Sequence, residues 1–186
     1  MNNNRKILAL GAIFLLSGII TAWLSYDPSR ILQYLFIAAS LGGGALAFRI
    51  GWKKKESFVQ SRYYTWIGTI LILGAISLGI WATTLLAFVN VVGFFLLVLG
   101  IGEFVFVQQI FSKESPFPWK ILGLKITLSA ITATGAAWIL TMSRIDVNVA
   151  LLFLGVLISL VGLNFMHVGR LTKLMDPSRN NISQDH

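Results

Sequence analysis

Residues 91–109, with the sequence VVGFFLLVLGIGEFVFVQQ, decide the fold of this chain. The stretch is apolar until its final two glutamines, apart from one carboxylate, that of Glu103. As an α-helix rising 1.5 Å per residue it would be about 28 Å long, close to the roughly 30 Å of hydrocarbon in a bilayer. It therefore predicts a helix that crosses a membrane and carries one acidic group inside it.

The composition agrees with a membrane protein. Of the 186 residues, 56% are hydrophobic and 12% are charged, whereas about a quarter of a soluble domain is charged. The basic residues behind the net charge of +8 stand in short segments between apolar runs. They lack the interleaved aromatic residues of a nucleic-acid-binding surface, so no nucleic-acid partner is expected. The absence of cysteine excludes disulfides, thiolate nucleophiles and cysteine-ligated metals.

Several apolar runs are long enough to span a bilayer, and they predict an all-α protein with a single integral domain over residues 1–168. Residues 63–111 carry one charge, Glu103, and would be about 73 Å long as a single helix. They must therefore hold two spans, with a reversal near Thr83 and Thr84.

The N-terminal apolar run is too long for a signal-peptide core, so we expect an uncleaved first span. Residues 169–186 form a polar tail. The predicted spans are 7–24, 31–50, 64–82, 85–109, 119–142 and 149–168.

The basic residues predict the orientation of these spans. An even number of spans places both termini on one side of the membrane, and 13 of the 15 lysines and arginines belong to that side. Only Arg30 and Arg144 belong to the other. Because positive charge favours the cytoplasmic side, both termini and the two longer loops are predicted to be cytoplasmic. The 13 residues are Arg5, Lys6, Arg49, Lys53, Lys54, Lys55, Arg62, Lys113, Lys120, Lys125, Arg170, Lys173 and Arg179.

A spacing of about 58 residues recurs along the chain. Trp23, Trp81 and Trp138 each stand near the end of an odd-numbered span, 58 and 57 residues apart. This regularity predicts that one helical hairpin is used three times. The alternative is chance, because glycine and tryptophan are common in membrane helices.

Glycines in the even-numbered spans follow the same spacing. Gly42, Gly100 and Gly162 are 58 and 62 residues apart, and Gly93 and Gly155 are again 62 apart. In membranes, small residues let helix backbones approach closely. We therefore predict that Gly42, Gly93, Gly100, Gly155 and Gly162 form helix-packing faces.

Glu103 and Lys125 are predicted to form an intramembrane pair. Glu103 precedes the end of its apolar run by eight residues, or about 12 Å of helix, and Lys125 lies about 9 Å into the next span from the same side. Charged groups at such depths face the bundle interior and find a partner. Two interpretations stay open: a structural pair, in which both side chains can also extend to the interface, or a protonatable site that acts on a proton or solute.

The other polar and aromatic residues predict less. Asn164 and His167 are secondary candidates near the aligned position of the last span. A histidine there could titrate near neutral pH, although a hydrogen-bonded packing role close to the interface is favoured for it. Tyr63, Tyr64, Trp66 and Trp119 are typical of an interfacial aromatic belt. The chain contains no phosphate loop, nucleophile elbow or metalloprotease motif, so we expect no enzyme, catalytic residue, cofactor or metal site.

Three hairpins in about 190 residues, with even spans of the form Val91 to Glu103, resemble the HdeD-like acid-resistance membrane proteins. The resemblance covers residues 7–168. The other copies depart from it, because Phe165 and Ala45 stand where the second copy has Glu103. It implies a multi-pass protein of the bacterial inner membrane, linked to acid or envelope stress and without catalytic activity.

Two other functions stay open beside this one. The first is a small proton-coupled transporter that uses Glu103, although no span is broken by a central proline as transport sites often are. The second is an assembly subunit of a membrane complex. The expected partners are the lipid bilayer and either a second copy of the chain or another membrane protein.

Overall fold

The computed structural model describes residues 3–26, 30–53, 58–111, 119–144 and 146–174. These residues form six α-helices and one short 3-10 helix. Each α-helix is long and apolar enough to cross a membrane, which confirms the predicted all-helical, multi-pass class. The helices are α1 (Asn3–Trp23), α2 (Arg30–Lys53), α3 (Phe58–Trp81), α4 (Leu85–Phe111), α5 (Trp119–Met142) and α6 (Val147–Leu174), with the 3-10 helix η1 (Leu24–Tyr26) after α1.

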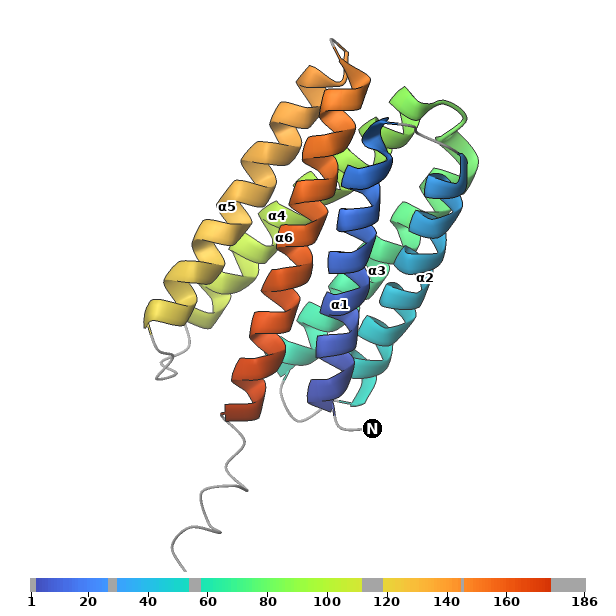
Figure 1. Ribbon diagram of the computed structural model, residues 1–186. Helices are drawn as coiled ribbons and strands as arrows, with labels where there is room; N and C mark the ends of the chain where they lie inside the picture. The colour runs from blue at the N-terminus through green and yellow to red at the C-terminus, as the bar shows by residue number, and fades with distance from the viewer. Residues whose placement is uncertain (1–2, 27–29, 54–57, 112–118, 145, 175–186) are drawn as a thin grey trace, which may run out of the picture.

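The helices form one bundle in which α1 begins and α6 ends at the same end (Figure 1). Two helix starts at the opposite end have side-chain caps. The Thr84 hydroxyl accepts the Ala87 N–H at 3.1 Å ahead of α4, and Asp146 Oδ1 accepts the Asn148 and Val149 N–H groups at 2.9 and 3.1 Å. Such caps satisfy backbone donors that a helix start leaves unpaired. The reversal between α3 and α4 therefore lies at residues 82–84.

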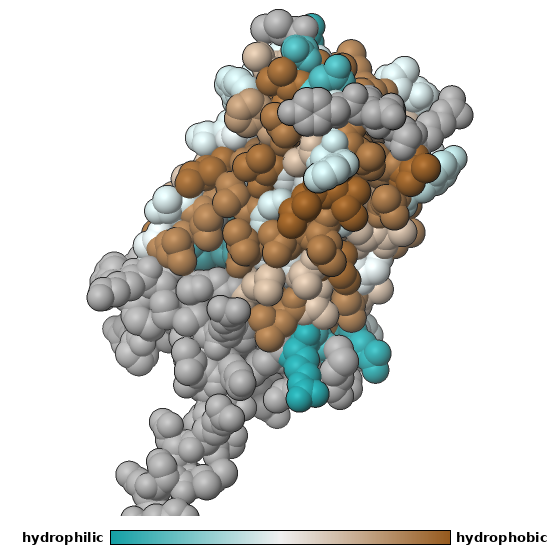
Figure 2. All heavy atoms as spheres, viewed as in Figure 1, coloured by the Kyte–Doolittle hydropathy of each residue, from teal (hydrophilic) through white to brown (hydrophobic). Residues whose placement is uncertain are grey.

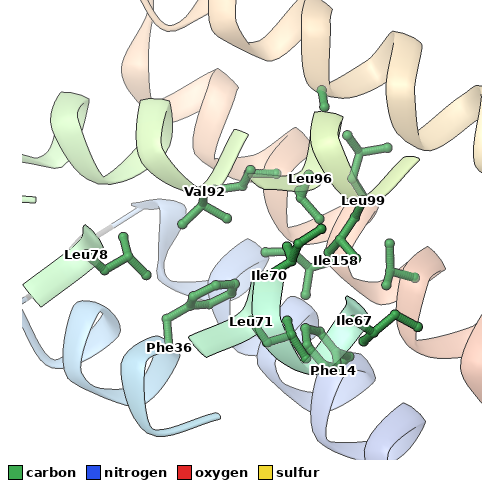
Figure 3. Close-up of a cluster of buried hydrophobic side chains, with 14 of the residues drawn as sticks. Phe14, Phe36, Ile67, Ile70, Leu71, Leu78, Val92, Leu96, Leu99 and Ile158 are labelled. Carbon is green, nitrogen blue, oxygen red and sulfur yellow. The ribbon is translucent and has the colours of Figure 1, made fainter. Parts of the chain in front are cut away.

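Apolar side chains fill the middle of the bundle and also cover its outside. Phe14, Phe36, Leu71, Leu96 and Ile158 meet in the core, each from a different helix (Figure 3). Hydrophobic residues also cover most of the face shown in Figure 2, and the most hydrophilic described residues lie towards its two ends. An apolar exterior of this kind suits a lipid environment.

Glycines bring three pairs of helices into close contact. The pairs α1 with α6, α2 with α3, and α4 with α5 pack most extensively. On α6, a Cβ added at Gly162 would lie 2.7 Å from the Gly11 carbonyl oxygen of α1, and one added at Gly155 would lie 2.7 Å from that of Gly18. Only glycine permits such backbone proximity, which increases dispersion contact where lipid provides no hydrophobic drive.

The other two pairs use the same device. A Cβ added at Gly44 of α2 would lie 3.2 Å from the Gly68 carbonyl oxygen of α3. One added at Gly100 of α4 would lie 2.7 Å from the Ala133 nitrogen of α5, and one at Gly93 would lie 3.2 Å from Leu140 Cδ2. Gly93, Gly100, Gly155 and Gly162 thus lie against neighbouring helices.

Two predictions need correction. Gly42 is exposed, and a Cβ there would meet no atom within 4 Å. It lies about 160° around the helix from Gly44, which makes the contact instead. In addition, α6 continues to Leu174, so the first six residues of the predicted tail are helical. Extending an anchored helix costs far less than nucleating one. Residues 175–186 lie outside the described structure.

Candidate functional site

Side chains from three helices meet at the end of the bundle where α1 begins. Tyr63 comes from α3, Glu103 from α4 and Lys125 from α5. Lys125 Nζ lies 2.7 Å from Glu103 Oε2 and donates a second hydrogen bond to the Tyr63 hydroxyl at 3.0 Å. The Tyr63 hydroxyl donates to Glu103 Oε1. We call these three residues the triad.

The triad is largely shielded from solvent, and its polar atoms pair with one another. Only 8% of the Glu103 side chain and 13% of the Lys125 side chain are exposed. Each Glu103 oxygen accepts a hydrogen bond, one from the phenol and one from the ammonium. Lys125 Nζ also lies 4.5 Å from the centroid of the Tyr63 ring, where the π-electron face attracts a cation. The buried charges therefore compensate each other within the cluster.

Aromatic rings surround the triad on the side of α3 and α4. The Tyr63 ring centroid lies 5.2 Å from those of both Tyr64 and Phe106, with edge-to-face geometry. The Trp66 and Phe106 centroids are 5.6 Å apart. The Trp66 indole covers Gly102 so closely that a Cβ there would overlap it. Gly102 precedes Glu103 directly, so this contact fixes α4 against α3 where the carboxylate leaves the helix.

The prediction of an interfacial aromatic belt is wrong for two of its members. Only 8% of Tyr63 and 2% of Tyr64 are exposed, so both belong to the bundle interior. Trp66 is partly buried against the core. The Trp119 side chain lies outside the described residues. Tyr63 is thus the member of the site that sequence reasoning missed.

Close packing of α4 on α5 explains why Glu103 can reach Lys125. Gly100 lies one turn before Glu103 and lets the α4 backbone approach Ala133 of α5. The two helices run antiparallel, so Glu103 and Lys125 both lie on the same side of this contact along the bundle axis. Their long side chains span the remaining axial separation.

Asn164, one of the two secondary candidates, does not join the triad. Asn164 is buried on α6, and its Oδ1 has no hydrogen-bond partner in the described structure. His167 lies on α6, but its side chain is outside the described residues. At the opposite end of the bundle, Asn90 Oδ1 accepts a hydrogen bond from Ser143 Oγ at 2.8 Å, which joins α4 to α5.

A small cavity of about 30 Å³ lies between α1, α2, α3 and α4. Its wall is nearly all apolar and includes Phe14, Phe36 and Leu71, which Figure 3 labels. Ser40 provides a hydroxyl. None of the triad residues lines it. Apolar cavities of this size remain dry, so this space offers no polar path to Glu103.

The site has limited chemistry of its own. Among the described residues, no group of three histidine, cysteine, aspartate or glutamate side chains could hold a metal ion. The triad can hold a proton, share it among a carboxylate, a phenol and an amine, and join three helices.

No protein-family model, curated protein or solved structure matches the chain.

Proposed function

We propose that the chain is a non-catalytic, multi-pass protein of the bacterial inner membrane, of the HdeD-like type, that supports survival under acid or envelope stress. Within it, the triad acts as a structural clamp between α3, α4 and α5. The observation that carries the clamp is the engagement of both Glu103 oxygens, by Tyr63 and by Lys125. A proton carrier needs a carboxylate that can change partners, whereas this one is held on both sides.

The energetics favour a clamp that forms as a unit. An unpaired charge inside a membrane costs about 2.5 to 3.5 kcal/mol on insertion scales. Removing one member of a buried pair destabilises a protein by about 3–5 kcal/mol, because the other charge remains buried. The three helices are therefore held in one arrangement for as long as the pair stays intact.

The proposal includes three repeated hairpins, α1 with α2, α3 with α4, and α5 with α6, with both termini cytoplasmic. The packing order supports it: the most extensive contacts join the even helix of one hairpin to the odd helix of the next, and α6 to α1. This is the pattern expected of a closed ring of three hairpins. The orientation rests on the 13-to-2 distribution of lysine and arginine.

Survival after an acid shift tests the stress function. A strain without the gene should survive less well than its parent, and a plasmid copy should restore survival. The matched variant is Glu103→Gln with Lys125→Met, which removes both charges together and should also restore survival if the triad is structural. Equal survival with and without the gene would refute the stress role.

A second function is favoured by the burial of an ionisable pair inside candidate spans, which often marks a transport path. It would make the chain a proton-coupled transporter that uses Glu103. Purified protein in liposomes should then carry a proton or solute flux that Glu103→Gln abolishes. A flux that persists in this variant, or no flux from the native chain, would leave the clamp as the role of Glu103.

A further inference from the structure

Asn164 on α6 is a buried polar side chain with an acceptor that nothing in the described structure satisfies. Only 7% of the residue is exposed, and Oδ1 has no hydrogen-bond donor. Buried polar atoms almost always have a partner, which is either protein or an ordered water. The unpaired oxygen therefore indicates a small bound molecule.

Two contacts show which way Asn164 faces. Phe153 and Trp138 have ring centroids 4.7 Å apart, and a Cβ added at Gly135 would lie 2.9 Å from Leu157 Cδ1. Both contacts join α6 to α5. At 100° per residue, Asn164 lies within about 20° of both Phe153 and Leu157 on the α6 helical wheel. Its side chain therefore projects towards α5.

The same contacts set the register between these antiparallel helices. Trp138 lies opposite Phe153, and Gly135 lies opposite Leu157. Because the helices run antiparallel, seven residues further along α6 correspond to seven residues back along α5, so Asn164 lies level with Leu128.

Ser129 and Thr132 lie within about one turn of this level, and both are buried. On the α5 wheel, Thr132 lies about 60° from Gly135, which contacts α6, whereas Ser129 lies about 40° from Ala133, which contacts α4. Thr132 is therefore the buried hydroxyl nearer to Asn164.

These hydroxyl groups cannot donate to Asn164 while they keep their present bonds. Ser129 Oγ donates to the Lys125 carbonyl and Thr132 Oγ1 donates to the Leu128 carbonyl, each at 2.8 Å. Each hydroxyl has one proton, so its remaining capacity is as an acceptor. The Asn164 amide oxygen and the Thr132 hydroxyl oxygen are therefore two buried acceptors on neighbouring helices.

We propose that a water molecule binds between α5 and α6, donating one hydrogen bond to Asn164 Oδ1 and the other to the hydroxyl oxygen of Thr132. Water fits because it supplies two donors in a small neutral molecule, and buried waters usually make two to four hydrogen bonds. An anion without a proton could not satisfy these acceptors. A cation would lie close to the Lys125 ammonium and be repelled.

This water site is independent of the stress function and of the clamp. It makes two parts of the bundle interior differ in polarity. The cavity between α1, α2, α3 and α4 is apolar, whereas the proposed site between α5 and α6 holds a hydrated polar group. The water would bridge α5 and α6 near the level of the triad, where no direct hydrogen bond between these two helices reaches Asn164 Oδ1.

A high-resolution structure of the native protein in lipid tests the proposal directly. We expect solvent density within hydrogen-bonding distance of both Asn164 Oδ1 and the Thr132 hydroxyl. An Oδ1 that accepts from a protein donor, or a space without solvent density, would overturn the proposal.

Thermal unfolding of two matched variants provides an independent measurement. Asn164→Leu removes the acceptor at similar volume and releases the water, so its Tm should stay within about 1 °C of the native value or rise. Asn90→Leu removes an acceptor that has a protein donor, Ser143, whose hydroxyl then keeps only the longer bond of 3.3 Å to the Leu140 carbonyl. Its Tm should fall by a few degrees. A comparable fall for Asn164→Leu would mean that Oδ1 has a protein donor, against the proposal.

Discussion

The Trp66 indole occupies the space that a side chain at Gly102 would need. Trp66 belongs to α3 and Gly102 to α4, and each lies close in sequence to a triad residue. The contact links the aromatic wall to the acidic group, because Glu103 follows Gly102 directly. The fit of one flat ring over one glycine thus sets the position of the carboxylate relative to Tyr63.

Gly102→Ala should destabilise the protein by about 1–3 kcal/mol, because the added methyl group overlaps the indole and forces α3 and α4 apart. Trp66→Phe in the same chain should restore much of this loss by removing the far ring. Unfolding by denaturing detergent measures both. Gly79→Ala is the control, since a Cβ there meets nothing within 4 Å. Equal stability of the Gly102 and Gly79 variants would contradict the prediction.

Lys125→Met should destabilise the protein by about 3–5 kcal/mol, because it leaves the Glu103 carboxylate buried with Tyr63 as its remaining donor in the triad. Adding Glu103→Gln should recover most of this loss by removing the unpaired charge. A double-mutant cycle measures the coupling between the two residues. Strictly additive losses would show that the pair does not act as a unit.

Tyr63→Phe should cost about 1–3 kcal/mol, because it removes a hydroxyl that donates to Glu103 and accepts from Lys125 while it keeps the ring contacts. Tyr34→Phe is a suitable control because 67% of Tyr34 is exposed, and it should change stability by less than about 0.5 kcal/mol. Equilibrium unfolding of the two variants side by side provides the comparison. If Tyr63→Phe changed stability as little as Tyr34→Phe, the Tyr63 hydroxyl would not be part of the clamp.

Gly155→Ala should destabilise the protein by about 1–3 kcal/mol, because its methyl group meets backbone atoms of α1, which cannot rotate away. A Cβ at Gly155 would lie 2.5 Å from the Ala22 nitrogen. Gly123→Ala on α5 provides the matched control, since a Cβ there meets nothing within 4 Å. Unfolding midpoints in detergent should separate the two, and the prediction fails if they coincide.

The helices and the ion pair could be predicted because both depend on length along the chain. An apolar run of about 20 residues has one stable form in lipid, a helix. Helical rise then converts residue number into depth, which places Glu103 and Lys125 at similar levels. Depth and charge were enough to predict that these two would be partners.

Features that depend on rotation around a helix could not be predicted in the same way. Gly42 and Gly44 differ by two residues, yet one faces outwards and the other contacts α3. Tyr63 resembles an interfacial aromatic residue in sequence because it stands beside Arg62 at the start of an apolar run. The role of Tyr63 depends on which helices α3 packs against. Likewise, nothing in the sequence around Gly11 or Gly18 of α1 indicates that these glycines contact α6. Such choices follow from tertiary packing.

The close contact between α1 and α6 has a consequence for biosynthesis. α1 is synthesised before α6, and its most extensive contact is with α6. At about 5–20 residues per second, translation from Trp23 at the end of α1 to Val147 at the start of α6 takes roughly 6–25 s. Throughout that interval, the surface around Gly11 and Gly18 must rest against lipid or the insertion machinery. The contact between α1 and α6 therefore forms only after α6 has been synthesised, and a chain that stops before α6 leaves the α1 surface around Gly11 and Gly18 without its partner helix.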